Sequence, residues 1–147
     1  MVKKTLKIGL TGGIGSGKTT VSNILKSLGI DIFNSDQYGK KVLKENKIVQ
    51  DKIYSIFGQG IISNGDVDRK KLAEIVFKKK SKLELLNKII HPIVIQEFNK
   101  WYSQKSSHYI IKESALLFES KTFHDLDAII LITGPIELRI NRVYHRD

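Results

Sequence analysis

A glycine-rich segment near the N-terminus has the residue types and spacing that bind phosphate groups. Residues 12–19, GGIGSGKT, match the full pattern G-x-x-x-x-G-K-[ST]. The N–H groups of such a loop can wrap a phosphate because no side chain obstructs them, and the following helix adds its positive dipole end. Lys18 would reach the β- and γ-phosphates, and the hydroxyl of Thr19 would join the shell of a bound Mg²⁺. The predicted phosphate contacts are Gly12, Gly13, Gly15, Ser16, Gly17, Lys18, Thr19 and Thr20.

A carboxylate downstream, Asp36, follows the apolar run at residues 30–33. In small-molecule kinases with this type of loop, an aspartate at the end of the second strand lies beside the γ-phosphate. There it can accept the proton of an attacking hydroxyl or orient that hydroxyl. The alternative role is an N-cap for the next helix, which aspartate fills well. We favour the first interpretation, in which Lys18 and Asp36 are the catalytic residues.

The string at residues 36–39, DQYG, also matches the D-x-x-G string of GTPases. It lies directly after the second apolar run, too close to the glycine loop, and no N-K-x-D string occurs in the sequence. We attribute the match to chance, so the sequence favours a kinase.

Other titratable residues have less decisive patterns. Glu113 closes the apolar run at 109–111 as a Walker B carboxylate would, but Lys112 interrupts that run, so a site role and a structural role stay open. His91 precedes Pro92, and such a histidine is more typical of a helix-end cap or a satisfied, partly buried side chain than of a catalytic acid.

The charged residues toward the C-terminus also have two interpretations. Glu119 is equally compatible with a surface carboxylate and a substrate contact. Arg139, Arg142 and Arg146 lie in the last helical segment, where phosphate contact is favoured over an exposed basic face.

The elements around the loop must position these groups. Residues 6–10 predict a short buried strand, and apolar residues keep helical spacing after Lys18 until Gly29, where the helix should end. Residues 30–33 predict a second strand. A strand, a glycine loop, a helix and a strand in this order form a βαβ unit, which implies a right-handed crossover and a parallel sheet. The fold class is therefore α/β.

After Asp36 the alternation of strand and helix stops, and helical patterns predict an inserted helical region. Pro92 is expected to separate two of its helices, because proline disfavours a helical conformation in the preceding residue. The helical patterns lie at 40–57, 69–77, 81–90 and 93–106, further strands at 109–111 and 128–133, and a final helix at 135–147.

The composition fits a single globular domain. The chain has 147 residues, of which 41% are hydrophobic and 27% charged, unlike disordered or membrane chains. The N-terminus has neither a signal-peptide nor a membrane-span pattern, so a cytoplasmic protein without a membrane partner is expected. The sequence contains no cysteine, which excludes disulfides and cysteine-based zinc sites and leaves oxygen-liganded metals.

The formal net charge of +10 would suit either a nucleic-acid backbone or a polyphosphate ligand. The lysines are scattered over 3–7, 40–52 and 78–82 without interleaved aromatic residues. Those at 78–80 lie where a helix should end, and the helix dipole favours cations there. We therefore favour a solvated basic face over a nucleic-acid partner.

Taken in order, several strings resemble the dephospho-CoA kinase family. The segment at 10–21, LTGGIGSGKTTV, is similar to the opening of that family's sequences, and the likeness covers essentially the whole chain. The other similar strings are Ser35-Asp36, Phe57-Gly58, Asp68-Arg69 with Leu72, Val76-Phe77, His91-Pro92, LLFE at 116–119, and Arg139, Arg142 and Arg146-Asp147. His91-Pro92 and LLFE are weak alone, but the ordered combination of these strings behind the glycine loop is specific.

The resemblance implies an ATP-dependent kinase that uses Mg²⁺. It would transfer the γ-phosphoryl group of ATP to the ribose 3′-hydroxyl of dephospho-CoA, in the last step of coenzyme A biosynthesis. It also implies that Asp36 is the candidate base and that Arg142 contacts ATP. The implied substrate contacts are Asp36, Arg69, His91, Leu116 and Glu119.

The resemblance also implies a three-part kinase within one domain, residues 1–147. The nucleotide-binding core would comprise residues 1–36 and 107–134, with helices on both faces of its sheet. Residues 37–106 would be a helical CoA-side insertion, and residues 135–147 would begin a lid. Arginines on such a lid suit phosphoryl transfer, which depends mainly on positioning and charge neutralisation.

The chain departs from the family pattern at two points. Asn34 stands where the family usually has an acidic residue, which weakens a metal role at that position. The family also continues by roughly one lid helix and a closing strand, so we expect a fragment with a partial lid. Such a fragment should bind the phosphates of ATP weakly and turn over poorly.

Two rival functions remain. Another kinase with this loop, acting on a nucleoside monophosphate or on shikimate, would share Lys18, Thr19 and Asp36 but would not explain the long helical insertion. A basic nucleic-acid-binding protein that keeps a nucleotide loop would explain the charge but not Asp36.

Overall fold

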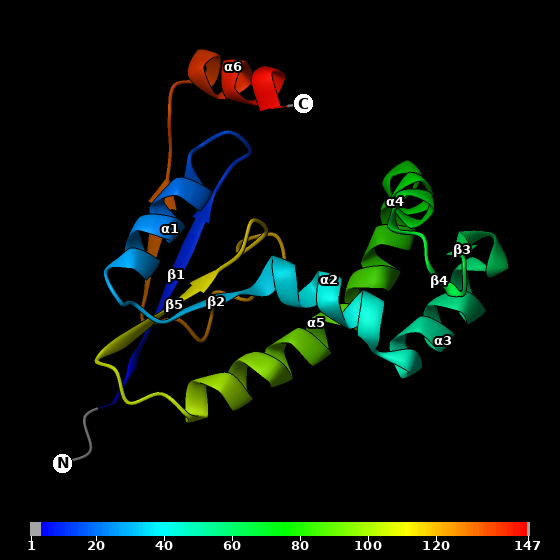
Figure 1. The fold of residues 1–147 in the computed structure, drawn as a ribbon, viewed down its shortest axis with the longest axis horizontal. Coiled ribbons are helices and arrows are strands. Elements are labelled where there is room, and N and C mark those ends of the chain that lie inside the picture. Colours follow the sequence, from blue (N-terminus) through cyan, green and yellow to red (C-terminus); the bar gives the residue numbers. More distant parts are fainter. Residues whose placement is uncertain (1–3, 147) are drawn as a thin grey trace. The chain divides into compact units, whose positions relative to one another are not determined.

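The computed structural model describes residues 4–146, which divide into two compact units (Figure 1). The core unit comprises Met1–Asp36 and Trp101–Asp147, and the helical unit comprises Gln37–Lys100. Asp147, the end of the predicted lid segment, and residues 1–3 lie outside the described part of the chain.

The core unit is built on a four-stranded parallel sheet with the strand order β2-β5-β1-β6. This arrangement confirms the predicted α/β fold with a parallel sheet. Leu10 of β1 lies beside Glu113 of β5, so the carboxyl ends of the two central strands meet at one edge. The strands are β1 (Leu6–Gly12), β2 (Ile32–Asn34), β5 (Tyr109–Glu113) and β6 (Ala128–Ile132).

Helix α1 (Lys18–Ser27) joins β1 to β2 and ends where the sequence predicts. Gly29 has φ 80° and donates its N–H to the Lys26 carbonyl, while the N–H of Ile30 bonds the Leu25 carbonyl. These two bonds are those of a Schellman motif, which needs a residue in the left-handed conformation. The motif draws Ile30 into the helix end, so the second strand begins at Ile32 rather than at residue 30.

The helical unit contains most of α2 (Ser35–Glu45) and α5 (Lys80–Ser103), with α3 (Lys47–Phe57), a 3₁₀ turn η1 (Gln59–Ile61) and α4 (Arg69–Lys78). A hairpin of β3 (Ile62–Ser63) and β4 (Asp66–Val67) lies between η1 and α4. Its turn residues Asn64 and Gly65 both have positive φ, which suits the Asn-Gly turn of a tight hairpin. The buried apolar side chains of this unit are Val42, Val49, Ile53, Ile61, Leu72, Val76, Leu86, Ile90, Val94 and Phe98.

The predicted helix break before Pro92 is wrong, because α5 continues through it. A proline inside a helix removes one backbone hydrogen bond and crowds the preceding turn. Here the buried side chains Ile90 and Val94 lie on either side of Pro92, so apolar burial on both sides offsets that cost. Along residues 4–146, no helix combines the length and the apolar character needed to span a bilayer.

Candidate active site

The glycine loop lies in the core unit, between the carboxyl end of β1 and the start of α1. Gly15 and Gly17 have φ of 72° and 97°, which a residue with a side chain rarely adopts. A Cβ on Gly12 would lie 2.5 Å from Ser16 Oγ and 2.7 Å from the Ile132 carbonyl oxygen. The packing and the backbone conformation of this loop therefore require glycine at these positions.

The beginning of α1 has the character of an anion site. Gly17 precedes the helix without a side-chain cap, and the first turn has no acidic residue. Its N–H groups and dipole therefore face no carboxylate of that turn. Ser16 Oγ is also buried in this loop without a hydrogen-bond partner among the described residues, and a buried polar atom of this kind is rare unless a ligand or water completes it.

Lys18, Glu113 and Asp36 come together at the carboxyl edge of the sheet. Lys18 Nζ lies 3.0 Å from Glu113 Oε1 and 3.9 Å from Asp36 Oδ2. The lysine side chain is 14% exposed, against 3% for Glu113 and 39% for Asp36. Ser22 donates its hydroxyl to Glu113 Oε2 at 2.6 Å. Glu113 thus holds the lysine from the sheet side, and Asp36 is the more accessible of the two carboxylates.

Asp36 lies inside the first turn of α2 and not at the position before the helix. Its Oδ2 accepts a hydrogen bond of 3.0 Å from the N–H of Ala115, which follows β5. This bond ties the carboxylate to the strand that supplies Glu113. An asparagine at this position would keep an oxygen that accepts from the Ala115 N–H but would lose the negative charge. It would therefore preserve a structural role of Asp36 and abolish a role as the base.

Lys112 breaks the apolar run of β5 but lies buried within the sheet. Burial lowers the pKa of its ammonium group, because desolvation penalises the charged form, while Asp125 acts in the opposite direction. Successive side chains of a strand point to opposite faces, so Lys112 and Glu113 serve different faces of β5. Lys112 therefore does not prevent Glu113 from reaching Lys18 on the other face of the strand.

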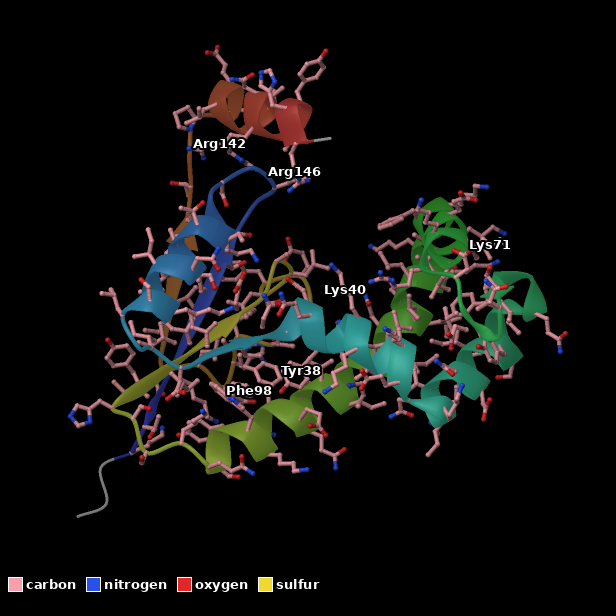
Figure 2. All side chains as sticks on the ribbon, viewed as in Figure 1. Tyr38, Lys40, Lys71, Phe98, Arg142 and Arg146 are labelled. Atoms are coloured by element: carbon pink, nitrogen blue, oxygen red, sulfur yellow. The ribbon has the colours of Figure 1, made fainter. Side chains whose placement is uncertain are left out.

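A hollow of about 760 Å³ opens over the glycine loop. Leu116 and Glu119 line it, and so do Arg142 and Arg146 of α6 (Ile136–Arg146). Both arginines project from α6 on the side of the glycine loop (Figure 2). Arg142 donates from Nη1 to the Gly15 carbonyl at 3.1 Å. The core unit thus brings Arg142, Leu116 and Glu119 to the predicted phosphate loop.

Arg69 and His91 belong to the helical unit. Arg69 lines a hollow of about 410 Å³ whose other lining residues are Lys40, Lys41, Leu43, Lys44, Glu45, Asp66 and Val67. Lys41 lies 3.9 Å from Glu45, whereas Lys40, Lys44 and Arg69 have no ion pair within the described chain. Lys40 and Lys44 were not predicted as site residues, although they are spaced by one helical turn in the sequence.

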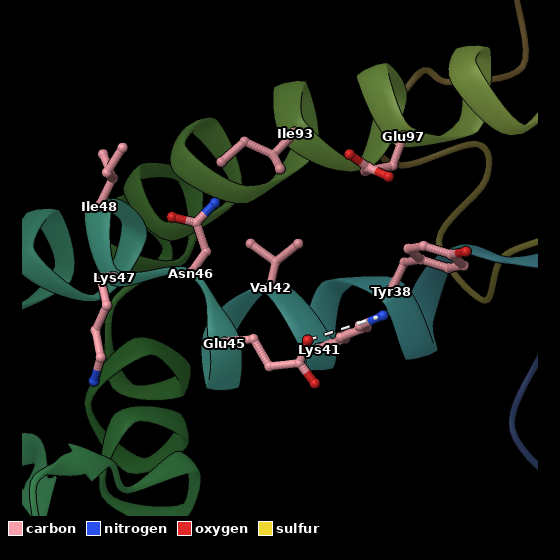
Figure 3. Close-up of a pocket in the computed structure, with 9 residues that line it drawn as sticks. All are labelled: Tyr38, Lys41, Val42, Glu45, Asn46, Lys47, Ile48, Ile93 and Glu97. Atoms are coloured by element: carbon pink, nitrogen blue, oxygen red, sulfur yellow. Dashed lines mark ion pairs between the residues drawn. The ribbon is translucent and has the colours of Figure 1, made fainter.

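A larger hollow of the helical unit, about 540 Å³, lies between α2, the start of α3 and α5 (Figure 3). Val42, Ile48 and Ile93 give it apolar walls, and Lys41 lies over the Tyr38 ring at 6.0 Å. Two carboxylates, Glu45 and Glu97, oppose its two lysines. Its cations and carboxylates are equal in number, whereas cations outnumber carboxylates around Arg69, so the hollow around Arg69 suits a phosphate group better.

The donor set near the loop fits Mg²⁺ better than a metal held by protein alone. Along residues 4–146, no group of three or more His, Cys, Asp or Glu side chains could hold a metal ion. Mg²⁺ bound with a nucleotide usually takes only one or two carboxylates, because phosphate oxygens and water complete its shell. The Thr19 hydroxyl and the carboxylates of Asp36 and Glu113 are of the required kind.

The sequence profile of the dephospho-CoA kinase family matches residues 6–147. A dephospho-CoA kinase from Fusobacterium nucleatum is 45% identical over 141 residues, which cover 95% of this chain and 72% of that protein. Another, from Bacillus licheniformis, is 36% identical and is matched over 97% of this chain and 73% of its own length.

Solved structures agree with the fold. The crystal structure of TT1252 from Thermus thermophilus superposes with a TM-score of 0.88 at 32% identity, covering 99% of this chain and 74% of that one. Shikimate kinase from Acinetobacter baumannii has a TM-score of 0.51 at 17% identity and covers 98% of this chain and 65% of its own, a likeness of fold alone.

Proposed function

The chain belongs to the dephospho-CoA kinase family, and from this premise we infer that it is an ATP-dependent kinase that phosphorylates dephospho-CoA. The products are ADP and coenzyme A, phosphorylated on the ribose 3′-hydroxyl. The observation that carries the inference is the placement of Lys18 beside Asp36, at the end of a glycine loop, in a chain that matches this family from residue 6 to residue 147. We further propose that the reaction takes place in the cytoplasm.

The proposed mechanism assigns a task to each group of the core unit. The loop N–H groups and Lys18 hold the phosphates, and Asp36 orients the attacking 3′-hydroxyl or accepts its proton. The new bond forms between that oxygen and the γ-phosphorus, while the bond to the β-γ bridging oxygen breaks. The proton passes to Asp36 and then to solvent. Arg142 and Arg146 add positive charge along the hollow over the loop.

Mg²⁺ belongs to this proposal as the partner of ATP. When bound, it neutralises charge on the β- and γ-phosphate oxygens. Thr19 would supply a hydroxyl ligand, and Glu113 adds a carboxylate beside Lys18. Asn34, which ends β2, contributes no carboxylate to this edge of the sheet. Asp36 and Glu113 are therefore the carboxylates of the proposed site.

We propose that the core unit and the helical unit each contribute residues that contact the acceptor. Leu116 and Glu119 would contact it from the hollow over the loop, and His91 from α5. Arg69, Lys40 and Lys44 would hold its diphosphate, because their cations line one hollow and have no carboxylate partner among the described residues.

The test of the function is ADP release from ATP with a panel of acceptors. Dephospho-CoA should be phosphorylated at least about 100-fold more efficiently than shikimate or a nucleoside monophosphate. A site whose polar side chains bind the diphosphate of the acceptor discriminates strongly against acceptors without a diphosphate. Efficient turnover of shikimate would overturn the assignment in favour of the rival kinase. Steeply salt-dependent DNA binding without ADP release would favour the nucleic-acid-binding alternative.

Replacing Lys40 and Lys44 together by glutamine should raise the KM for dephospho-CoA by roughly tenfold, since two charge-assisted contacts to the diphosphate are lost. The KM for ATP should not change. With adenosine as acceptor, which has a 3′-hydroxyl but no diphosphate, the variant should match the parent.

The matched control is the double replacement of Lys79 and Lys80 by glutamine. It removes the same charge from the junction of α4 and α5, and neither lysine lines the hollow around Arg69. Equal effects of the two pairs would mean that only the net charge matters, and the proposed diphosphate site would be wrong.

A further inference from the structure

The three arginines of α6 do not lie equivalently on the glycine loop. Arg142 and Arg146 line the hollow over the loop, whereas Arg139 does not. Arg139 instead lines a separate apolar hollow of about 470 Å³, together with Ile14, Ile136, Ile140, Val143 and Tyr144. Ile14 and Val143 line both hollows, so the two adjoin, and Arg139 borders the apolar hollow and not the proposed phosphate site.

Arg139 contacts the loop closely along its backbone. Its Nε donates a hydrogen bond of 3.0 Å to the Ile14 carbonyl. A Cβ on Gly13 would overlap the Nη2 atom of Arg139, and one on Gly15 would lie 2.5 Å from the Arg139 carbonyl oxygen. Two loop glycines are therefore covered by this one residue of α6, and any side chain in their place would displace it.

The hydrogen bond from Arg139 to the Ile14 carbonyl also fixes the direction of the next N–H group, that of Gly15, which can bind phosphate. In a planar trans peptide, the carbonyl and the following N–H point in opposite directions. Fixing the Ile14 carbonyl toward the Arg139 side chain thus turns the Gly15 N–H away from that side chain. Gly15 has φ 72°, and glycine can exchange between conformations at low cost. Without an anchor, this peptide unit could rotate and withdraw its N–H.

We propose that Arg139 is a positioning residue for nucleotide binding, which holds the Ile14–Gly15 peptide with its N–H directed to the phosphate side of the loop. It acts through the backbone of the loop and not by contacting phosphate, unlike the role proposed for Arg142. The proposal rests on the use of ATP at this loop but not on the identity of the acceptor. Binding of ATP in the absence of acceptor therefore tests it separately from the proposed function.

The first experiment compares Arg139→Gln with Arg139→Lys by calorimetric titration with Mg²⁺-ATP. Glutamine is too short to replace the anchor, so the dissociation constant should rise about tenfold, the loss of one charge-assisted hydrogen bond. Lysine keeps a long donor and should recover part of this loss. In turnover assays the KM for ATP should rise, while kcat at saturating ATP should stay within about threefold, because bound ATP itself orders the loop.

Lys26→Gln is the matched control, since it removes one positive charge from the end of α1 in the same unit. It should leave ATP affinity unchanged. A merely structural role of Arg139 would lower the melting temperature of the free protein without changing the ratio of ATP affinities between the glutamine and lysine variants. An Arg139→Gln protein that binds ATP as tightly as the parent would overturn the proposal.

A double-mutant cycle with Gly13→Ala tests the contact itself. In the parent, the added methyl group would push Arg139 away, so ATP affinity should fall strongly. In the Arg139→Ala background that clash is absent, and Gly13→Ala should cost about three- to tenfold less, which is a coupling typical of residues in contact. Equal effects of Gly13→Ala in both backgrounds would show that Arg139 does not act through this contact, and the proposal would fail.

Discussion

Replacing Lys18 by alanine should lower turnover by about 10³-fold or more. Lys18 is the loop's own cation, and phosphoryl transfer relies on such charge to offset the negative charge of the β- and γ-phosphates. The glycine loop would still offer its N–H groups, so ATP should bind with reduced affinity rather than not at all.

The surroundings of Lys18 complicate the simple alanine experiment. Glu113 is almost fully buried and accepts from Lys18 at 3.0 Å and from Ser22 at 2.6 Å. Removing the lysine leaves this carboxylate without its cation, which should cost stability on the order of 1–3 kcal/mol. Loss of activity in Lys18→Ala alone could therefore arise from partial unfolding.

The double variant Lys18→Ala with Glu113→Gln separates these two causes. Glutamine has nearly the shape of glutamate and can still accept from Ser22, so the free energy of unfolding should recover most of the loss. Turnover should stay low, as measured by ADP release with dephospho-CoA. Recovery of activity together with stability would mean that Lys18 is structural, and it would remove the central catalytic assignment.

Local sequence patterns predicted the parts of this site that depend on local structure. The loop, the start of α1 and its end at Gly29 follow from residues close together in the chain, because glycine conformations and helix caps are local effects. The position of Lys18 was predictable for the same reason. For its partner Glu113 the sequence left a site role and a structural role open, since the contact with Lys18 depends on β5 lying beside β1 in the sheet. Strand order is a property of tertiary packing that no single segment encodes.

Tertiary packing also explains the wrong prediction at Pro92 and the failure to distinguish Arg139 from Arg142. The local preference of Pro92 predicts a helix end, but buried side chains on both sides of it keep α5 continuous. Arg139 and Arg142 could not be separated in the sequence because they are three residues apart on one helix and therefore share a face. Which of them reaches the phosphate hollow depends on how the loop curves against α6.

Replacing Asp36 by asparagine should lower kcat by about 10²–10⁴-fold if the carboxylate acts as the general base. Asparagine keeps an oxygen that can accept from the Ala115 N–H, so the connection between α2 and the end of β5 should persist. What it loses is the negative charge 3.9 Å from Lys18 Nζ and the ability to take a proton. Both substrates should still bind with nearly unchanged affinity.

Glu74→Gln provides the matched control for Asp36→Asn. It removes one exposed carboxylate from α4, and Glu74 lines none of the hollows described above; a surface substitution of this kind usually changes stability little. Both variants should therefore melt close to the parent, while only Asp36→Asn loses turnover. If Asp36→Asn instead keeps its kcat and loses about 1 kcal/mol of stability, the expected size of a helix-terminal effect, then Asp36 supports α2 and the base must be sought elsewhere. Glu113 would then be a poor replacement, because its side chain is only 3% exposed and both of its oxygens are already bonded.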